Sequence, residues 1–304
     1  MIEWTNDLIK QGDYKIALLI DEGISHQLAW AFDRYDKESD VIEAVRKFIT
    51  TNIFNRVKDF NGLFLFAGEG SNNYRKQHVL TYKEDRKTRP QAKWLHAIKD
   101  FFTKKGKVIY NQLEADDVCV ILHRYYEKQY KLGNTDFRTC IVSADKDLVQ
   151  AGGHIFKPSR RLKGIEQADV FAYINEQDAE QWLWKQVLMG DGGDGVGGLH
   201  NVGITTASHI IEELPIMGNI VDTVRFHYKM ARYKTEHKEE VIDSGGVIIP
   251  LETEEEYHRR VTELAELDYI NTFKQIYIHR DDSYFKSFNI NQKIYIPPFK
   301  KYKS

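Results

Sequence analysis

Four short apolar runs alternate with helical patterns over the first half of the chain. The runs are KIALLID (15–21), LFLFAG (63–68), KVIY (107–110) and RTCIVSAD (138–145), with HIFKPS (154–159) as a fifth candidate. Apolar residues at helical spacing fill 40–60, 91–104 and the stretch from 114 to about 133. Strands that alternate with helices in this way predict an α/β fold with a mainly parallel sheet flanked by helices.

Acidic residues stand where these runs end. Asp21 closes the first run, Glu69 follows the second, and Asp145 and Asp147 follow the fourth. Ligands of a parallel sheet bind at the carboxyl ends of its strands. We therefore expect these side chains to gather at one edge of the sheet.

The segment YNQLEADDVCVILHR (110–124) places Glu114, Asp116 and Asp117 at the start of an apolar helical run. Three interpretations stay open for it. The acids could complement the positive end of the helix dipole, form an exposed acidic face, or contribute oxygen ligands to a hard divalent cation. The acids at the strand ends favour the third.

Beyond about residue 175 the pattern becomes mainly helical. MGDGGDGVGG (189–198) holds Asp191 and Asp194 at a helix end, and the glycine-rich stretch continues to about 211. A glycine turn between two helices exposes backbone N–H groups that can bind phosphate oxygens. Residues 232–256 are charged and contain DSGG, which predicts an exposed loop or a hairpin.

Eight acids from these segments form one candidate constellation, which would repel strongly without cations. Carboxylate ligands suit Mg²⁺ or Mn²⁺, and two such ions close together would relieve the repulsion. The eight are Asp21, Glu114, Asp116, Asp117, Asp145, Asp147, Asp191 and Asp194.

Composition restricts the alternatives. The net charge of −2 gives no global argument for nucleic acid, but seven Lys and Arg against two acids lie between Ser71 and Leu95. No apolar run approaches the length of a membrane span, and the N-terminus lacks a signal-peptide layout. The two cysteines lie in apolar runs and are expected to be buried and reduced, as in a cytoplasmic protein.

The motifs occur in the order ID (20–21), a basic arch, LEADD (113–117), SADKD (143–147), GDGGD (190–194) and a glycine turn ending in TTA (205–207). The order of these motifs resembles that of the flap-endonuclease-type 5′ nuclease superfamily. The chain is most similar to the phage 5′→3′ exonucleases that also degrade RNA primers, as ribonucleases H do. The resemblance implies a PIN-like α/β domain over 1–175, with the arch at 71–95. It also implies a helical duplex-binding domain over 176–304 with a helix–three-turn–helix module.

The resemblance also implies residue roles. The eight acids would hold two metal ions, with Asp21, Asp145 and Asp147 central to catalysis and Lys83 adding electrostatic stabilisation. In the arch, Tyr74, Arg75, Lys83 and Arg86 would meet the scissile phosphate and the single strand. In the glycine turn, Gly198, Val202 and Gly203 would line the duplex, and K⁺ could bind there.

Two departures from the family pattern stand out. Relatives have an aspartate after the second strand, where this chain has Ala67 and Gly68 followed by Glu69. We expect Glu69 to reach a metal in its place and to matter for cleavage much more than Glu22. The turn also has Asn201 and Thr205 where a glycine and a lysine are usual; asparagine tolerates left-handed backbone geometry, so the turn can survive.

The sequence therefore predicts a metal-dependent 5′→3′ exonuclease or flap endonuclease. Its partners would be DNA with 5′ ends or flaps, RNA–DNA hybrids, and replication proteins bound through the basic C-terminal tail. If the gene is a phage gene, the protein would act in the bacterial cytoplasm. Two alternatives remain: a PIN-type ribonuclease, against which the glycine turn counts, and a nucleic-acid-binding protein that has lost catalysis.

Overall fold

The computed structural model describes most of the chain and is divided into two compact units. The described residues are 2–8, 10, 12–71, 73–78, 82–84, 88, 90–162, 165–212, 219–237, 240–242, 248–250, 252–276 and 300–301. The first unit holds Met1–Tyr74, Thr88–Ala179 and Ile278–Ser304, and the second holds Arg75–Lys87 and Glu180–Tyr277. None of the described helices is long and apolar enough to cross a membrane.

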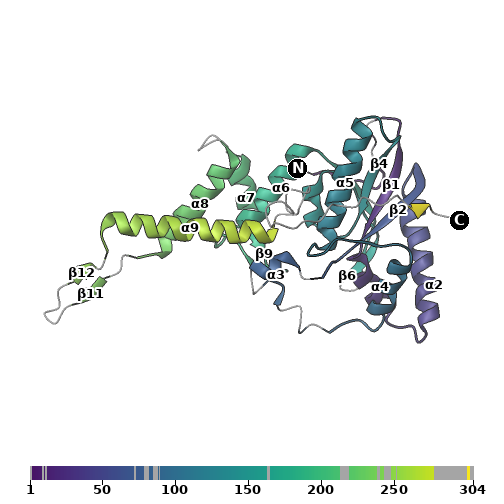
Figure 1. The fold of residues 1–304 in the computed structure, drawn as a ribbon, viewed down its shortest axis with the longest axis horizontal. Coiled ribbons are helices and arrows are strands. Elements are labelled where there is room, and N and C mark those ends of the chain that lie inside the picture. The colour runs from purple at the N-terminus through teal and green to yellow at the C-terminus, as the bar shows by residue number, and fades with distance from the viewer. Residues whose placement is uncertain are drawn as a thin grey trace. The chain divides into compact units, whose positions relative to one another are not determined.

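The first unit is built on a sheet with strand β1 (Lys15–Asp21) at its centre (Figure 1). Its described strands run in the order β13-β2-β1-β4-β5-β8, and β3 pairs with β2. The pairs among β1 to β5 are parallel, whereas β8 and β13 are antiparallel to their neighbours. The other strands are β2 (Phe60–Gly68), β3 (Val108–Ile109), β4 (Phe137–Val142), β5 (Gly153–Lys157), β8 (Val170–Ile174) and β13 (Lys300–Lys301).

Helices cover both faces of this sheet because β1 is apolar on both sides. Ile16, Leu18 and Ile20 join one core cluster with α1 (Ile24–Ala31), α2 (Glu38–Phe48) and α4 (Leu95–Lys104). Ala17 and Leu19 point the other way and pack against α5 (Ala115–Lys131). Figure 1 shows α5 on one side of β1 and β4, with α2 and α4 on the other. The mainly parallel α/β architecture is therefore confirmed.

The predicted strands are present, and the differences lie in neighbouring elements. The helix expected over 40–60 ends at Phe48, followed by a π-helical turn (Ile49–Ile53) and a 3₁₀ turn (Phe54–Arg56). β-Branched residues in ITTNI favour this break, since they restrict side-chain rotamers in a helix. The helix α1, the antiparallel strand β8 and the small hairpin of β6 (Arg160–Leu162) with β7 (Ile165–Gln167) were not predicted.

The second unit is mainly helical, as expected. Its helices are the greater part of α6 (Glu176–Met189), α7 (Ile204–Glu212), α8 (Ile220–Thr235) and α9 (Glu254–Ile276), and α8 lies against α9. The charged segment after α8 forms a hairpin of β11 (Glu240–Ile242) and β12 (Ile248–Pro250), which is one of the two forms expected for it. A short helix, α3 (Tyr74–His78), begins at the boundary of the units.

The sequence-based division at 175/176 remains a prediction, but the compact units divide the chain differently. The chain passes from the first unit to the second inside α6, between Ala179 and Glu180, four residues from the predicted boundary. Residues 75–87 of the predicted arch belong to the helical unit. The C-terminal strand β13 pairs with β2 of the first unit, so the only described part of the basic tail is an edge strand.

Candidate active site

Asp21 is the last residue of β1 and its side chain is buried, 5% exposed. Its Oδ1 accepts a hydrogen bond from the Gly23 N–H at 2.9 Å, and its Oδ2 accepts one from the Ser143 hydroxyl at 2.7 Å. Burial raises the pKa of this carboxyl to about 6, against the two hydrogen bonds that lower it, and the charges of Asp145 and Glu22 add to the increase. Among the described residues, no lysine or arginine forms an ion pair with this carboxylate.

Ser143 joins Asp21 to the next strand end. Ser143 directly follows β4, and its Oγ also accepts a hydrogen bond from the Asp145 N–H at 3.0 Å. The Asp145 carboxylate is exposed and accepts from the Asp147 N–H at 2.9 Å, which starts the 3₁₀ turn η4 (Asp147–Ala151). Asp145 thus accepts a backbone hydrogen bond at the start of a short helix, and it lies close enough to raise the pKa of Asp21.

The three acids of α5 also have structural roles. Glu114 is the N-cap residue and forms a capping box with Asp117, whose carboxylate accepts from the Glu114 N–H at 3.1 Å. Asp117 is fully buried, whereas Asp116 is partly exposed. Burial raises the pKa of the Cys119 thiol, and the charges of Asp21 and Asp116 raise it further, so both acids lie near this thiol. The helix-terminus interpretation is therefore realised, together with proximity to Asp21.

Within the described residues, no three acidic, histidine or cysteine side chains converge closely enough to form a metal-binding group as they stand. The donor chemistry nevertheless fits a hard cation. The set offers carboxylate oxygens only, and Asp21 is a buried carboxylate that a cation would balance. The acids fall into two sets, because Asp191 and Asp194 belong to the second unit and the other six to the first.

The two glycines beside Glu69 do not adopt left-handed backbone angles. Neither Gly68 nor Gly70 has a positive φ; instead, a Cβ on Gly70 would lie 2.1 Å from the Tyr110 carbonyl oxygen. Glu69 itself is exposed, and no hydrogen bond or ion pair to its carboxylate is present among the described residues. Its role as a metal ligand remains a prediction.

In the second unit, Lys83 lies against one of the predicted metal ligands. Its Nζ is 3.2 Å from Asp194 Oδ2, and its N–H donates to the Asp194 carbonyl oxygen at 3.3 Å. Lys83 has a φ of 54°, an unusual value for a lysine. Asp191 is buried and accepts from the Gly193 N–H at 2.9 Å, in a turn between β9 (Gly190–Asp191) and β10 (Val196–Gly197). The two acids therefore lie in a hairpin rather than on a helix.

Two of the predicted arch contacts are buried. Tyr74 is 3% and Arg75 is 2% exposed, and the Arg75 Nε–H donates to the Gln275 carbonyl oxygen at 3.1 Å. Contact of these side chains with nucleic acid stays a prediction, and it requires that they become accessible. Arg86 lies outside the described residues.

The glycine turn after α6 depends on glycine or asparagine at particular positions. A Cβ on Gly198 would lie 2.1 Å from the Met189 carbonyl carbon, so only glycine fits there. Asn201 has a φ of 60°, which confirms that asparagine takes over a left-handed position. The Val202 N–H donates to the Leu199 carbonyl oxygen at 3.2 Å. Gly203 has no heavy atom within 4 Å of an added Cβ, so the turn is open at that residue.

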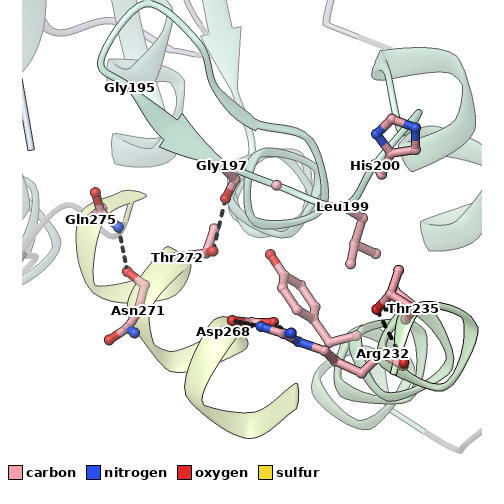
Figure 2. A pocket seen from close by; sticks show the side chains of 13 residues that line it. Gly195, Gly197, Leu199, His200, Arg232, Thr235, Asp268, Asn271, Thr272 and Gln275 are labelled. Atoms are coloured by element: carbon pink, nitrogen blue, oxygen red, sulfur yellow. Dashed lines mark hydrogen bonds and ion pairs between the residues drawn. The ribbon is translucent and has the colours of Figure 1, made fainter. Parts of the chain in front are cut away.

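A pocket of about 420 Å³ lies where this turn meets α8 and α9 (Figure 2). The Thr272 hydroxyl donates to the Gly197 carbonyl oxygen at 3.0 Å, which ties the turn to α9. Beside it, Arg232 forms a two-point ion pair with Asp268. These contacts hold the turn in place within the second unit.

Two residues of the strand-end region, Ser143 and Glu22, were not predicted from the sequence. Ser143 gave no signal except its place two residues before Asp145. Glu22 was given no role, yet it is 3% exposed and forms an ion pair with Lys107, 2.7 Å between Oε1 and Nζ. No local pattern connects Glu22 with Lys107, because the two residues lie 85 positions apart in the chain.

Comparison with known proteins agrees with this architecture. The chain aligns with the flap endonuclease of bacteriophage T5, in a complex with DNA and metal ions, at a TM-score of 0.51 and 16% identity, covering 89% of this chain and 90% of that one. A structure of the T5 protein co-crystallised with metal ions gives a TM-score of 0.50, 16% identity, and coverage of 89% and 91%. The chain has the fold of a phage 5′ nuclease. The resemblance to the 5′ nuclease superfamily is thus confirmed at the level of fold.

Sequence relatives point in the same direction. DNA polymerase I of Lactococcus lactis subsp. lactis (strain IL1403) is 26% identical over 183 residues, and that of subsp. cremoris (strain MG1363) is 25% identical over 183 residues. Each match covers 57% of this chain, which spans about a fifth (20%) of the length of these relatives. No protein-family profile matches the chain.

Proposed function

We propose that this protein is a metal-dependent 5′ nuclease that hydrolyses phosphodiesters of DNA, and of RNA in RNA–DNA hybrids, as in primer removal during replication. The observation that carries the proposal is the buried Asp21 carboxylate, whose pKa is raised to about 6 at the carboxyl end of a parallel sheet. The fold shared with the T5 flap endonuclease supports it, as does the alignment with bacterial DNA polymerase I.

In this proposal, Asp21, Asp145, Asp147 and the acids at the start of α5 would hold two divalent ions, Mg²⁺ or Mn²⁺. That Asp191 and Asp194 of the second unit bind metal as well remains a prediction. Such ions lower the pKa of a bound water and stabilise charge on the attacked phosphodiester. Ser143 and the Gly23 N–H fix the Asp21 carboxylate in one orientation.

The other residues bind the substrate. Lys83 neutralises charge on the scissile phosphate, which requires its ammonium group to turn from Asp194, its partner in this structure. The open backbone at Gly203 receives a phosphate of the duplex, since no atom of the described residues lies within 4 Å of the place where a Cβ would stand.

Cleavage of 5′-labelled flap, blunt-duplex and RNA–DNA substrates tests the proposal. We expect short products from the 5′ end with Mg²⁺, none with EDTA, and none from a flap whose 5′ end is blocked by bound streptavidin. Glu43→Gln, an exposed acid on α2, is the matched control for the acidic variants and should leave the rate unchanged. Cutting of single-stranded RNA without a free 5′ end would favour the PIN-type ribonuclease. Flap binding without cutting would favour a binding protein.

A further inference from the structure

The backbone of Glu22 follows strand β1, but its carboxylate lies at the end of strand β2. Glu22 directly follows β1, and its N–H donates to the Ala67 carbonyl oxygen of β2 at 2.9 Å. Its Oε2 accepts a hydrogen bond from the Glu69 N–H at 2.9 Å. The side chain therefore crosses to the carboxyl end of β2, where it is buried at 3% exposure.

Gly68 makes room for this carboxylate. A Cβ at Gly68 would lie 2.8 Å from Glu22 Oε2 and 2.4 Å from the Lys107 Cδ. Both distances are shorter than real Cβ atoms show, so a side chain at this position would have to displace the pair. The space at the end of β2 is thus occupied by an acid delivered from β1 and by a lysine from the start of β3.

Lys107 gives Glu22 a balancing charge. Its Nζ lies 2.7 Å from Glu22 Oε1, and its side chain is 8% exposed. Lys99 lies farther away, 4.0 Å from the same oxygen, and its side chain is 29% exposed. Burial of an ion pair costs desolvation energy that its attraction often fails to recover, so the pair is poorly explained by stability alone.

We propose that Glu22 and Lys107 are positioning residues that set how tightly the strand-end acids hold a divalent cation. The inference rests on the proposed function. Glu22 adds negative charge directly beside Asp21, and the ammonium group of Lys107 limits it. Glu22, rather than the exposed Glu69, is then the acid that matters at the end of β2.

Removal of each partner should change metal affinity in opposite directions. Lys107→Met leaves the negative charge of Glu22 without its ion-pair partner, and we expect Mn²⁺ to bind about tenfold more tightly. Glu22→Gln leaves the positive charge of Lys107 without its partner, and we expect Mn²⁺ to bind about tenfold more weakly. The measurement is calorimetric titration of the full chain with Mn²⁺ alone, without nucleic acid. A purely structural role would weaken binding in both variants.

The double variant Glu22→Gln/Lys107→Met tests the same idea without leaving a buried charge, so it also serves if a single variant does not fold. Its affinity should lie within about threefold of wild type. Glu43→Gln and Lys99→Met are the controls, expected to shift affinity less than threefold. If both single variants shift in the same direction, or if the double variant loses affinity tenfold, the inference is wrong. If wild type binds no Mn²⁺, the proposed function fails, and the inference with it.

Discussion

The two ends of strand β1 bury polar side chains in different ways. At its amino end, Glu127 accepts hydrogen bonds from Arg138 and from the Thr139 N–H at 2.9 Å, and Tyr14 shares one with His154 at 2.8 Å. At its carboxyl end, Asp21 has two neutral hydrogen-bond donors and acidic neighbours. At the amino end the Glu127 carboxylate is paired with Arg138, whereas at the carboxyl end the Asp21 carboxylate has no ion-pair partner among the described residues.

Two buried carboxyls show the difference directly. Despite burial, the pKa of Glu127 is lowered by His123, Arg138 and Thr139. Burial raises the pKa of Asp21 to about 6, because its hydrogen bonds do not offset the loss of water. The comparison suggests that the amino end stabilises the fold, whereas the carboxyl end gives up stability for binding, a common property of functional sites.

Asp21→Asn should have the largest effect and should separate stability from activity. We expect cleavage to fall by about a thousandfold. The free energy of unfolding in EDTA at pH 7 should rise by up to about 3 kcal/mol, because a pKa raised from 3.8 to about 6 means that the charged form is unfavourable in the folded state. Flap cleavage and urea unfolding measure the two quantities. A variant that loses both would show that Asp21 is an ordinary buried residue.

Glu127→Gln should do the reverse. It leaves Arg138, whose side chain is only 12% exposed, without its carboxylate, and we expect a loss of about 3 kcal/mol in the free energy of unfolding. Cleavage at a temperature where the variant is folded should match wild type, since the amino end has no part in the proposed chemistry. Reduced cleavage by fully folded protein would remove the distinction between the two ends.

The pH dependence of stability should also differ between the ends. Burial lowers the pKa of His123 to about 4 and of His154 to about 3. Below pH 6.5 both histidines are therefore protonated in the unfolded chain while they are still neutral in the folded protein, which favours unfolding. In the Asp21→Asn variant, the free energy of unfolding should fall by up to about 2.7 kcal/mol per pH unit between pH 6 and 4.5.

In wild type the slope over the same range should be about half as steep. The folded Asp21 carboxyl takes up a proton near pH 6 that the unfolded chain takes up only near 3.8, which offsets one histidine. Urea unfolding at several pH values measures both slopes. Equal slopes for the two proteins would show that the Asp21 pKa is not raised.

Ser143→Ala should have the smallest effect. It removes one hydrogen bond to Asp21, and we expect about a tenfold loss of cleavage and about 1 kcal/mol of stability. Thr139→Val, which removes the hydroxyl beside His123 at the amino end, is the matched control and should lower stability without slowing cleavage. A full-rate Ser143→Ala enzyme would mean that the orientation of Asp21 does not depend on this contact.

The sequence predicted those parts of the molecule that local patterns determine. Residues 16–20 of β1 and 140–142 of β4 are continuous apolar runs, so these strands, the sheet and the position of Asp21 could be inferred directly. Asn201 was recognised as a left-handed position because asparagine tolerates that geometry. α1 was missed because it follows Asp21 after only two residues, which left no loop to mark a new element.

Long-range pairing could not be predicted in the same way. The pairing of Glu22 with Lys107 depends on where β1 and β3 lie in the sheet, and that of Lys83 with Asp194 on how residues 75–87 pack in the helical unit. The burial of Arg75 is a similar case, because a basic residue in a basic stretch gives no sign that it will be enclosed.

Unfolding of wild type and Asp21→Asn with and without Mg²⁺ tests the central claim most directly. In EDTA the variant should be the more stable protein. Saturating Mg²⁺ should stabilise wild type, by about 2.7 kcal/mol at a hundred times the dissociation constant, and leave the variant much less affected, so the difference between them shrinks or reverses. A wild type that is the more stable protein in EDTA and does not respond to Mg²⁺ would contradict the claim that the carboxyl end of the sheet is built to hold a cation.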